Sequence, residues 1–223
     1  MRRIRREKLD RLVLPDSVER STLIKFVAAL HARSESQLRH LQSEMSRILR
    51  FAENIKEQAA RASAEQRKAM AMLAPPKSTP SKSLDELSGL VAEPQRKLME
   101  HVAAETVLMS AMNLGFFGAP AGHEFITSDV PVTWFDPDLY KRAPFYQVLG
   151  LGYRNVEVTL PVSPKLILHI SHHPQLSGRW MLASEPMVEE FNRRTRWECY
   201  RDFVTIHNRK NPYWFIDLKP PPA

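Results

Sequence analysis

Two small polar residues, Ser128 and Asp129, end an apolar run that is predicted to be a strand, just before Pro131. Segments at the ends of strands often carry binding and catalytic residues. Asp129 could act there as a general base or as a metal ligand. The alternative is structural, because Asp and Ser in turns commonly hydrogen-bond to nearby backbone groups. The pattern favours this capping role and keeps both residues as candidate binding residues.

A second polar group lies in the segment Leu160-Pro-Val-Ser-Pro164, between two apolar runs. Because proline cannot continue a central ladder, the segment is predicted to be a turn or an edge crossing. Ser163 and Lys165 would then stand near one end of the sheet. If Asp129 lies at the same end, the three side chains form a polar cluster. Extension of Lys165 into solvent is the simpler alternative.

Asn192 is predicted to lie on the inward face of a helix, beside Val188, Phe191 and Thr195. A buried amide without partners costs about 1 to 3 kcal/mol, so this side chain should be hydrogen-bonded. The candidate partners are backbone groups of the Ser128-Asp129 turn or of the turn at 161–164. Asn192 is therefore predicted mainly to hold two backbone segments together through its side-chain amide, a role that we call a structural bracket, and only secondarily to contact a ligand.

Other patterns that carry chemistry are weak or absent. His169, His172 and His173 suggest a metal site, but residues 169 and 172 of a continuing strand point to opposite faces, and no nearby Cys or acidic pair completes a zinc set. The sequence has no Walker loop, G-x-G-x-x-G loop, nucleophile elbow or C-x-x-C pair. We therefore expect neither a bound metal nor a cofactor.

The elements that position these residues begin with helices. Residues 16–74 contain neither glycine nor proline and are rich in strong helix formers. They predict one helix over 16–33 and another over 35–73. A third helix is predicted over 95–114, stopped by Gly115 and Gly118. The proline-rich segment 74–83 is predicted to be an exposed loop.

An apolar stripe with alternating spacings of three and four runs along the second helix. This spacing is typical of a helix that pairs with another helix. Alanines replace larger residues toward the end of the stripe, and this favours a helical hairpin within the chain. The alternative is an intermolecular coiled coil, which would make the protein a homo-oligomer. The members of the stripe are Leu38, Leu41, Met45, Ile48, Ala52, Ile55, Ala59 and Ala62.

The second half of the chain predicts strands at 124–128, 156–160, 165–170 and 203–207, with a helix capped by Ser184 before the last one. Helices first and mostly antiparallel strands later indicate an α+β fold. Residues 1–118 are predicted to form a basic arm and a helical region. Residues 119–223 are predicted to form a small sheet with one C-terminal helix, sharing a core with the helices.

The net charge of +7 lies entirely in residues 1–100, which hold 20 basic and 13 acidic side chains, whereas residues 101–223 hold 12 of each. Its densest part is an arm that contains Arg2, Arg3, Arg5 and Arg6. Such an arm can bind phosphates or anionic lipid, or can simply keep the protein soluble.

Cysteine usage and hydropathy bear on location. The chain has a single cysteine, Cys199, which excludes an internal disulfide and favours a reducing compartment. No run approaches the ~20 apolar residues of a membrane helix, and residues 1–14 lack the apolar stretch of a secretory signal. We expect a soluble cytoplasmic protein.

Several of these segments resemble DUF4238, a mostly bacterial family of unknown function. The similar segments are Phe26-Val-Ala-Ala-Leu-His-Ala-Arg33, Phe125-Ile-Thr-Ser-Asp-x-Pro-Val132, Leu160-Pro-x-Ser-Pro-Lys165 and Val188-x-x-x-Asn192. Together the resemblance covers about residues 16–206. It implies a shared fold and a shared polar cluster, and it supplies no reaction.

Two departures from the family pattern concern polar groups. Val130 stands where the family usually has Asn. The chain also shows no counterpart of the family's N-terminal segment, a His followed by a stretch rich in Val-Pro and Tyr-Leu-Arg. The resemblance therefore implies a truncated or divergent member that lacks part of the polar equipment.

Two function classes follow. The first is a binding or interaction protein that contacts nucleic acid or another anionic partner through its basic N-terminal half. The alternative is a phosphodiester-directed hydrolase in which Asp129 is the base or a metal ligand, while Ser163, Lys165 and Asn192 position an anion.

Overall fold

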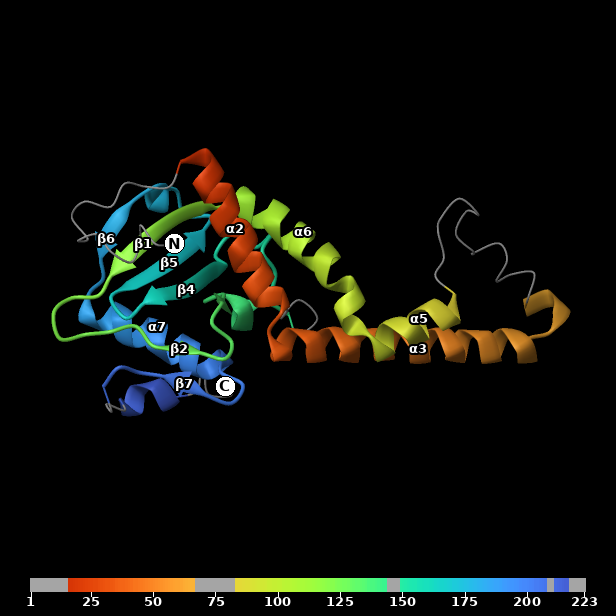
Figure 1. Cartoon of the computed structure of the whole chain (residues 1–223). Coiled ribbons are helices and arrows are strands. Elements are labelled where there is room, and N and C mark those ends of the chain that lie inside the picture. Colours follow the sequence, from red (N-terminus) through yellow and green to blue (C-terminus); the bar gives the residue numbers. More distant parts are fainter. Residues whose placement is uncertain (1–15, 67–82, 144–148, 208–210, 217–223) are drawn as a thin grey trace. The chain divides into compact units, whose positions relative to one another are not determined.

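The computed structural model describes residues 16–66, 83–143, 149–207 and 211–216, which form two compact units (Figure 1). The first unit comprises residues 16–35 and the described residues from Glu100 onward; the second comprises those within 36–99. Side chains of α2 (Ser17–Ala32) and of the end of α6 (Leu98–Ser110) contribute to the core of the sheet. The division into residues 1–118 and 119–223 stays a prediction.

The first unit contains a five-stranded sheet in the order β3-β4-β5-β1-β6. Its strands are antiparallel except for the parallel pair β1 and β6. A separate antiparallel pair joins β2 to β7. The bounds are β1 Asn113–Gly118, β2 Thr127–Ser128, β3 Thr133–Phe135, β4 Glu157–Ser163, β5 Leu166–Ser171, β6 Trp180–Leu182 and β7 Phe203–Val204. The α+β prediction with a small, mostly antiparallel sheet is confirmed.

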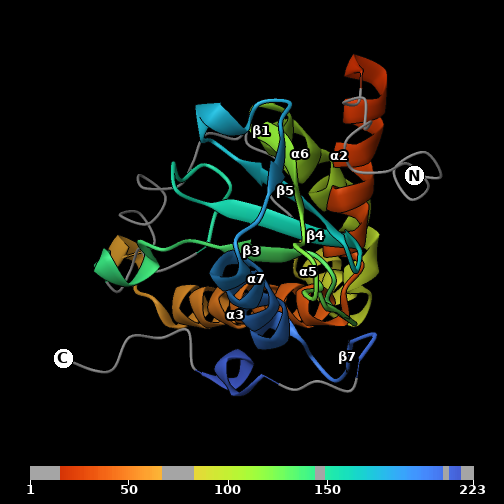
Figure 2. The same cartoon turned by 90° about the vertical axis from the view of Figure 1, so that its left-hand side faces the viewer.

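Helices of this unit cover both faces of the sheet (Figures 1 and 2). They are α2 (Ser17–Ala32), α6 (Leu98–Ser110) and α7 (Glu185–Glu198). One core cluster joins α2 and the end of α6 to the strand face that carries Phe116. The other joins α7 to the opposite face, which carries Phe117. The two phenylalanines separate because successive side chains of a strand point to opposite faces.

The sequence prediction for residues 111–118 is wrong. Helix α6 ends at Ser110, and residues 113–118 form the strand β1 instead of a helix end. Gly115 does not stop a helix; it lets another segment approach the strand, since a Cβ there would lie 2.8 Å from the carbonyl oxygen of Leu176. A contact of this kind leaves no local pattern in the sequence.

The second unit pairs helix α3 (Glu35–Arg61) with helix α5 (Leu84–Ala92), followed by a 3-10 turn at Pro94–Lys97. Helix α3 ends twelve residues before the predicted end, and residues 67–73 lie outside the described residues. Helix α5 was not predicted, although Ser83 and Glu86 form a capping box at its start. Of the predicted loop 74–83, only its last residue is described.

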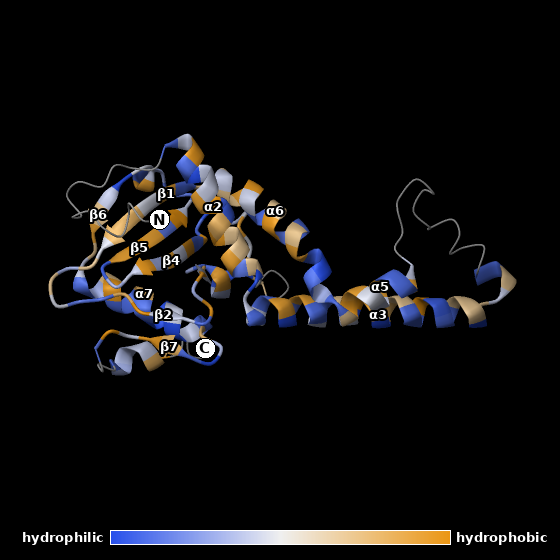
Figure 3. Ribbon diagram, in the orientation of Figure 1, coloured by the Kyte–Doolittle hydropathy of each residue, from blue (hydrophilic) through white to orange (hydrophobic). Residues whose placement is uncertain are grey.

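The apolar stripe of α3 is covered over only part of its length. Leu41 is buried, and Gln42 donates a hydrogen bond to the carbonyl oxygen of Val91 at the end of α5 (3.2 Å). Farther along, Ile48 and Ile55 are exposed. Figure 3 shows apolar residues alternating with polar ones along this helix. Pairing of the stripe with a second copy of the chain stays a prediction.

The predicted basic arm, with its four arginines Arg2, Arg3, Arg5 and Arg6, lies outside the described residues. The described residues of the second unit, 36–66 and 83–99, contain seven basic and seven acidic side chains and so carry no net charge. The positive excess of the N-terminal half therefore belongs to the arm and to residues 67–82. Of the helices that the structure describes, none has the length and hydropathy needed to span a membrane.

Candidate functional site

The Ser128-Asp129 turn is held by hydrogen bonds to the backbone. The carboxylate of Asp129 accepts from the amides of Tyr200 (3.0 Å) and Arg201 (2.7 Å), which follow α7. Burial raises the pKa of Asp129, but these amide hydrogen bonds outweigh it and lower the pKa below its usual value. The Ser128 hydroxyl bonds to the amide and carbonyl of Val130. This geometry supplies the capping chemistry that Asp and Ser provide in turns.

Residues 160–163 of the segment predicted to be a turn or an edge crossing belong to strand β4, and Pro164 lies in the turn that leads to β5. Strand β4 continues to Ser163, with Pro161 opposite Ile167 of β5 and an irregularity between residues 161 and 163. The prolines are tolerated because β3 pairs only with residues 157–159, which leaves this end of β4 at an edge in the described sheet. The Ser163 hydroxyl accepts from the amide of Lys165 (3.3 Å).

Asn192 is 1% exposed and joins helix α7 to the segment before β2. Its side-chain oxygen accepts from the amide of Ile126 (3.0 Å), and its side-chain nitrogen donates to the carbonyl of Glu124 (2.8 Å). These partners lie upstream of the two turns expected from the sequence. Both functional groups of the side chain are therefore used in positioning backbone.

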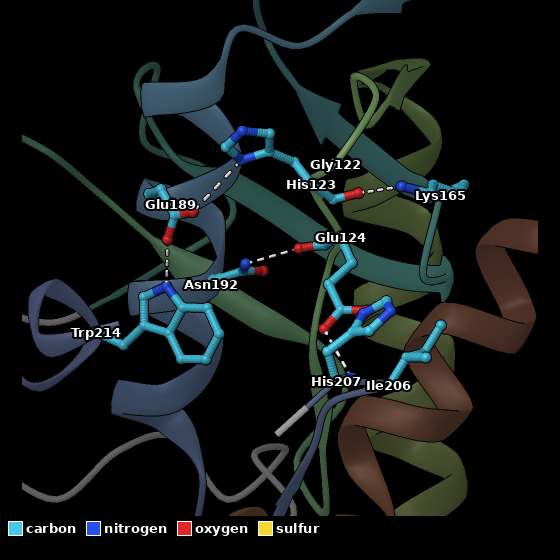
Figure 4. Close-up of a pocket in the computed structure, with 9 residues that line it drawn as sticks. All are labelled: Gly122, His123, Glu124, Lys165, Glu189, Asn192, Ile206, His207 and Trp214. Carbon is cyan, nitrogen blue, oxygen red and sulfur yellow. Dashed lines mark hydrogen bonds and ion pairs between the residues drawn. The ribbon is translucent and has the colours of Figure 1, made fainter. Parts of the chain in front are cut away.

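A pocket of about 460 Å³ lies over this bracket (Figure 4). Its volume is within the usual range for small-molecule sites. The lining includes two of the predicted site residues, Lys165 and Asn192, and does not include Ser128, Asp129 or Ser163. The described residues that line the pocket are Gly122, His123, Glu124, Lys165, Glu189, Asn192, Ile206, His207 and Trp214.

Two histidines reach the pocket from different segments, each beside a carboxylate. His123 lies between two glutamates of α7, with its Nε2 3.4 Å from Glu185 Oε1 and its Nδ1 3.6 Å from Glu189 Oε1. His207 Nδ1 lies 3.2 Å from Glu124 Oε2. Figure 4 shows the two imidazoles on separate walls. The pocket thus holds two histidine and carboxylate pairs.

The remaining walls combine one cation with apolar surface. Glu189 Oε2 accepts hydrogen bonds from the indole N–H of Trp214 (2.6 Å) and from the side-chain amide of Asn211 (2.7 Å). These bonds hold the segment that contains Asn211 and Trp214 against α7. The ammonium of Lys165 donates to the carbonyl oxygen of His123. Within the described parts of the chain, no carboxylate forms an ion pair with this ammonium.

The sequence did not indicate most of these residues. His123, Glu124, His207 and Trp214 come from separated segments whose spacing matches no motif. The one periodic signal is the i, i+4 pair Glu185 and Glu189, which places both carboxylates on one face of α7. From the sequence alone, this pair indicates only an ordinary exposed face of a helix, because nothing shows that His123 lies beside it.

The three histidines that were considered as a metal site and set aside, His169, His172 and His173, do not line this pocket. His169 is buried with its Nε2 3.4 Å from Glu157 Oε2, and His172 Nε2 lies 2.8 Å from the carbonyl of Leu151. His173 is exposed. Among the residues that the structure describes, no three His, Cys, Asp or Glu side chains are grouped so that they could hold a metal ion.

An ion-pair network lies between α7 and the sheet. Arg194 bonds to Glu157 of β4 and to Glu190 one turn earlier in its own helix. Burial raises the pKa of Glu157, but the hydrogen bond from His169 and the charge of Arg194 outweigh it and bring the pKa to about 2. The ionised carboxylate therefore stabilises the fold.

This network makes a pH-dependent contribution to stability. In the unfolded chain Glu157 returns to its ordinary pKa of 4.5, so its contribution is complete above that pH and is lost as the pH falls through 4.5 toward 2. We expect a loss of about 2 kcal/mol between pH 6 and pH 3. Urea unfolding should show this loss in the wild type and not in Glu157→Gln. The exposed control Glu53→Gln should behave as the wild type, and a Glu157→Gln curve that keeps the loss would contradict the assignment.

Comparison with protein-family models matches residues 2–210 to DUF4238, described as a protein of unknown function. The match includes the basic arm as well as the segments whose resemblance covers residues 16–206. Neither the curated proteins nor the solved structures yielded a match. Because the family model spans nearly the whole chain, this protein is a member of the DUF4238 family.

Proposed function

We propose that the protein is a binding protein and that its pocket takes a small anionic ligand with an apolar part. The observation that carries this proposal is the ammonium of Lys165, which faces the pocket without a carboxylate partner in the described chain. An ammonium has three donors, and the carbonyl of His123 uses one of them. The others are available to a ligand.

The carboxylates of the pocket are already engaged by protein donors. Glu189 accepts from Trp214 and Asn211, and Glu124 accepts from the amide and ring of His207. These bonds reduce their capacity to receive a cationic ligand. A ligand that offers acceptors to Lys165 therefore fits the unused hydrogen-bonding capacity better than one that offers donors.

The apolar part of the ligand would lie against Trp214 and Ile206. Both side chains line the pocket, and the indole is fixed by its hydrogen bond to Glu189. Ile206 is 61% exposed and can contact the ligand, whereas Trp214 is 4% exposed and offers only a small part of its indole. Aromatic carboxylates and nucleotides combine an apolar ring with an anion.

We also propose a cytoplasmic location in bacteria. The single Cys199 is typical of proteins from reducing compartments, and the resemblance is to a mostly bacterial family. Contact of the basic arm with nucleic acid remains part of the same proposal, since both sites would recognise phosphate.

Removal of the Lys165 charge should weaken anion binding. We expect benzoate or AMP to bind the full chain, with Lys165→Met raising the Kd about tenfold or more, because a hydrogen bond from a charged group contributes about 1.5 to 3 kcal/mol. Calorimetry measures the Kd directly.

The matched control is Lys25→Met, which removes an exposed lysine of α2 that lies outside the pocket. Its affinity should equal that of the wild type. Benzylamine serves as the cationic comparison. Equal loss in both lysine variants, or tighter binding of benzylamine than of benzoate, would refute an anion site at Lys165.

A further inference from the structure

Both ring nitrogens of His123 face carboxylate oxygens. Its Nε2 lies 3.4 Å from Glu185 Oε1, and its Nδ1 lies 3.6 Å from Glu189 Oε1. The side chain is 14% exposed, and Nδ1 is buried without a hydrogen-bond partner in the described part of the chain. A neutral imidazole has one donor and one acceptor nitrogen, whereas an imidazolium has two donors. The protonated ring is therefore the form that matches both carboxylates.

The backbone that carries this ring is held at two points. The carbonyl of Glu124 accepts from the side chain of Asn192 (2.8 Å), and the carbonyl of His123 itself accepts from the ammonium of Lys165. The imidazole is therefore kept beside α7, as Figure 4 shows, and the same residue positions the cation of the proposed anion site.

The charges of the pocket make anion binding depend on protons. With both imidazoles neutral, the described lining has two carboxylates, Glu124 and Glu189, and one ammonium, Lys165, and so carries a net charge of −1. A lining of this charge opposes the binding of an anion. A proton on His123 brings the net charge to zero. His207 can also take up a proton, but its side chain is 77% exposed, so water screens its charge more strongly.

We propose that the binding of an anion to this pocket is coupled to the uptake of a proton by His123. The imidazolium adds a second positive charge to that of Lys165. The pocket therefore holds its ligand at acidic and neutral pH and releases it as the pH rises. This inference rests on the proposed anion site and adds its regulation.

The charged groups around His123 determine the direction of the coupling. Glu185 and Glu189 of α7 favour the imidazolium, whereas the ammonium of Lys165 in the β4–β5 turn, bonded to the carbonyl of the same residue, opposes it. An anion bound at Lys165 offsets the charge of this ammonium. By thermodynamic linkage, a ligand that binds more tightly to the protonated pocket also makes His123 bind its proton more tightly.

Calorimetric titration of the full chain with benzoate from pH 5.5 to pH 8.5 tests the coupling. Benzoate is chosen because carboxylates titrate at about pH 4 and stay ionised over this range, whereas the phosphate of AMP titrates at about pH 6. We expect the Kd to rise about tenfold or more between pH 6 and pH 8.5. At pH 7, titrations in buffers with different heats of ionisation should show that protons are taken up as benzoate binds.

His123→Gln keeps a side chain that donates and accepts hydrogen bonds but takes up no proton. Its Kd should stay near the wild-type value at pH 8.5 and should change by less than about threefold over the whole range. The matched control His101→Gln removes an exposed histidine of α6 outside the pocket and should keep the wild-type pH dependence. If His123→Gln kept the full pH dependence, the assignment to His123 would be overturned.

Glu185→Gln tests the same pairing at a side chain that is 69% exposed, so this variant should fold even if the His123 variant does not. It removes one of the two carboxylates that favour the imidazolium. In an NMR titration of the His123 ring, we expect the midpoint at a lower pH in Glu185→Gln than in the wild type. Saturating benzoate should move the wild-type midpoint to a higher pH. A midpoint that stays in place in both experiments would refute the coupling.

The outcomes separate this inference from the proposed binding function. If benzoate binds in a Lys165-dependent way with the same Kd at pH 6 and pH 8.5, proton coupling is refuted and the anion site stands. If benzoate binds at no pH in this range, the anion site fails and the coupling fails with it. A pH dependence that is present in the wild type and lost in His123→Gln would support both.

Discussion

Replacement of Asn192 by alanine should lower the free energy of unfolding by about 3 kcal/mol. The side chain is buried and satisfies the amide of Ile126 and the carbonyl of Glu124. Its removal leaves both backbone groups without their partner, and an unpaired buried group costs about 1 to 3 kcal/mol. Urea unfolding of the full chain, followed by circular dichroism, measures the change.

Two further variants make this test specific. Asn155→Ala removes an exposed amide that bonds to Asp138 and should cost less than about 1 kcal/mol. Asn192→Asp keeps an acceptor for Ile126 but turns a second oxygen toward the carbonyl of Glu124. Burial and this repulsion would raise the pKa of the new carboxyl, so its stability should recover as the pH falls and the group is protonated. An Asn192→Ala variant as stable as the Asn155 control would refute the bracket.

The second large effect is expected at Gly115, where alanine should destabilise the protein by about 3 kcal/mol. A Cβ at this position would lie 2.8 Å from both Cδ1 and the carbonyl oxygen of Leu176 and 3.0 Å from the carbonyl of Arg179. Two of these atoms are backbone and cannot turn aside. They are also held to β1, since Phe116 donates to Arg179 and Gly178 donates to Leu114. Overpacking of such a site strains the backbone or separates the strands.

The matched control is Gly152→Ala. A Cβ there would meet no atom within 4 Å, and this glycine has no positive φ. We expect its free energy of unfolding to increase by less than about 1 kcal/mol, because alanine restricts the conformations of the unfolded chain. Similar melting temperatures for Gly115→Ala and Gly152→Ala would show that residues 174–180 do not lie as close to Gly115 of β1 as described.

Elements with a strong local signal were predictable from the sequence. Helix α2 follows the capping residue Asp16 and a long run without glycine or proline, and α7 follows Ser184. Strands β4 and β5 coincide with short runs rich in Val, Ile and Leu, and β5 is buried at all six positions. In each case the residues that form the element also carry its propensity, its cap and its periodicity. These elements were enough to establish the α+β class.

Strand β1 and helix α5 show where local signals fail. The run Asn113-Leu-Gly-Phe-Phe-Gly118 contains two glycines, which suggest a helix end or a turn. Its pairing with β5 and β6 on either side, together with the approach of Leu176, makes it a central strand. Helix α5 is short, so its capping box at Ser83 was the only sequence feature that indicated it.

The sequence by itself determined the fold class and the main helices, and it named Lys165 and Asn192 as candidate site residues without indicating this pocket. The tertiary structure alone decided that His123, Glu189 and His207 meet there, because their segments are brought together by β2–β7 pairing and by the bracket of Asn192. Propensity and periodicity act over a few residues, whereas this pocket is built by contacts between segments more than 60 residues apart in the chain. Chemistry that depends on such contacts leaves no spacing in the sequence from which it could be predicted.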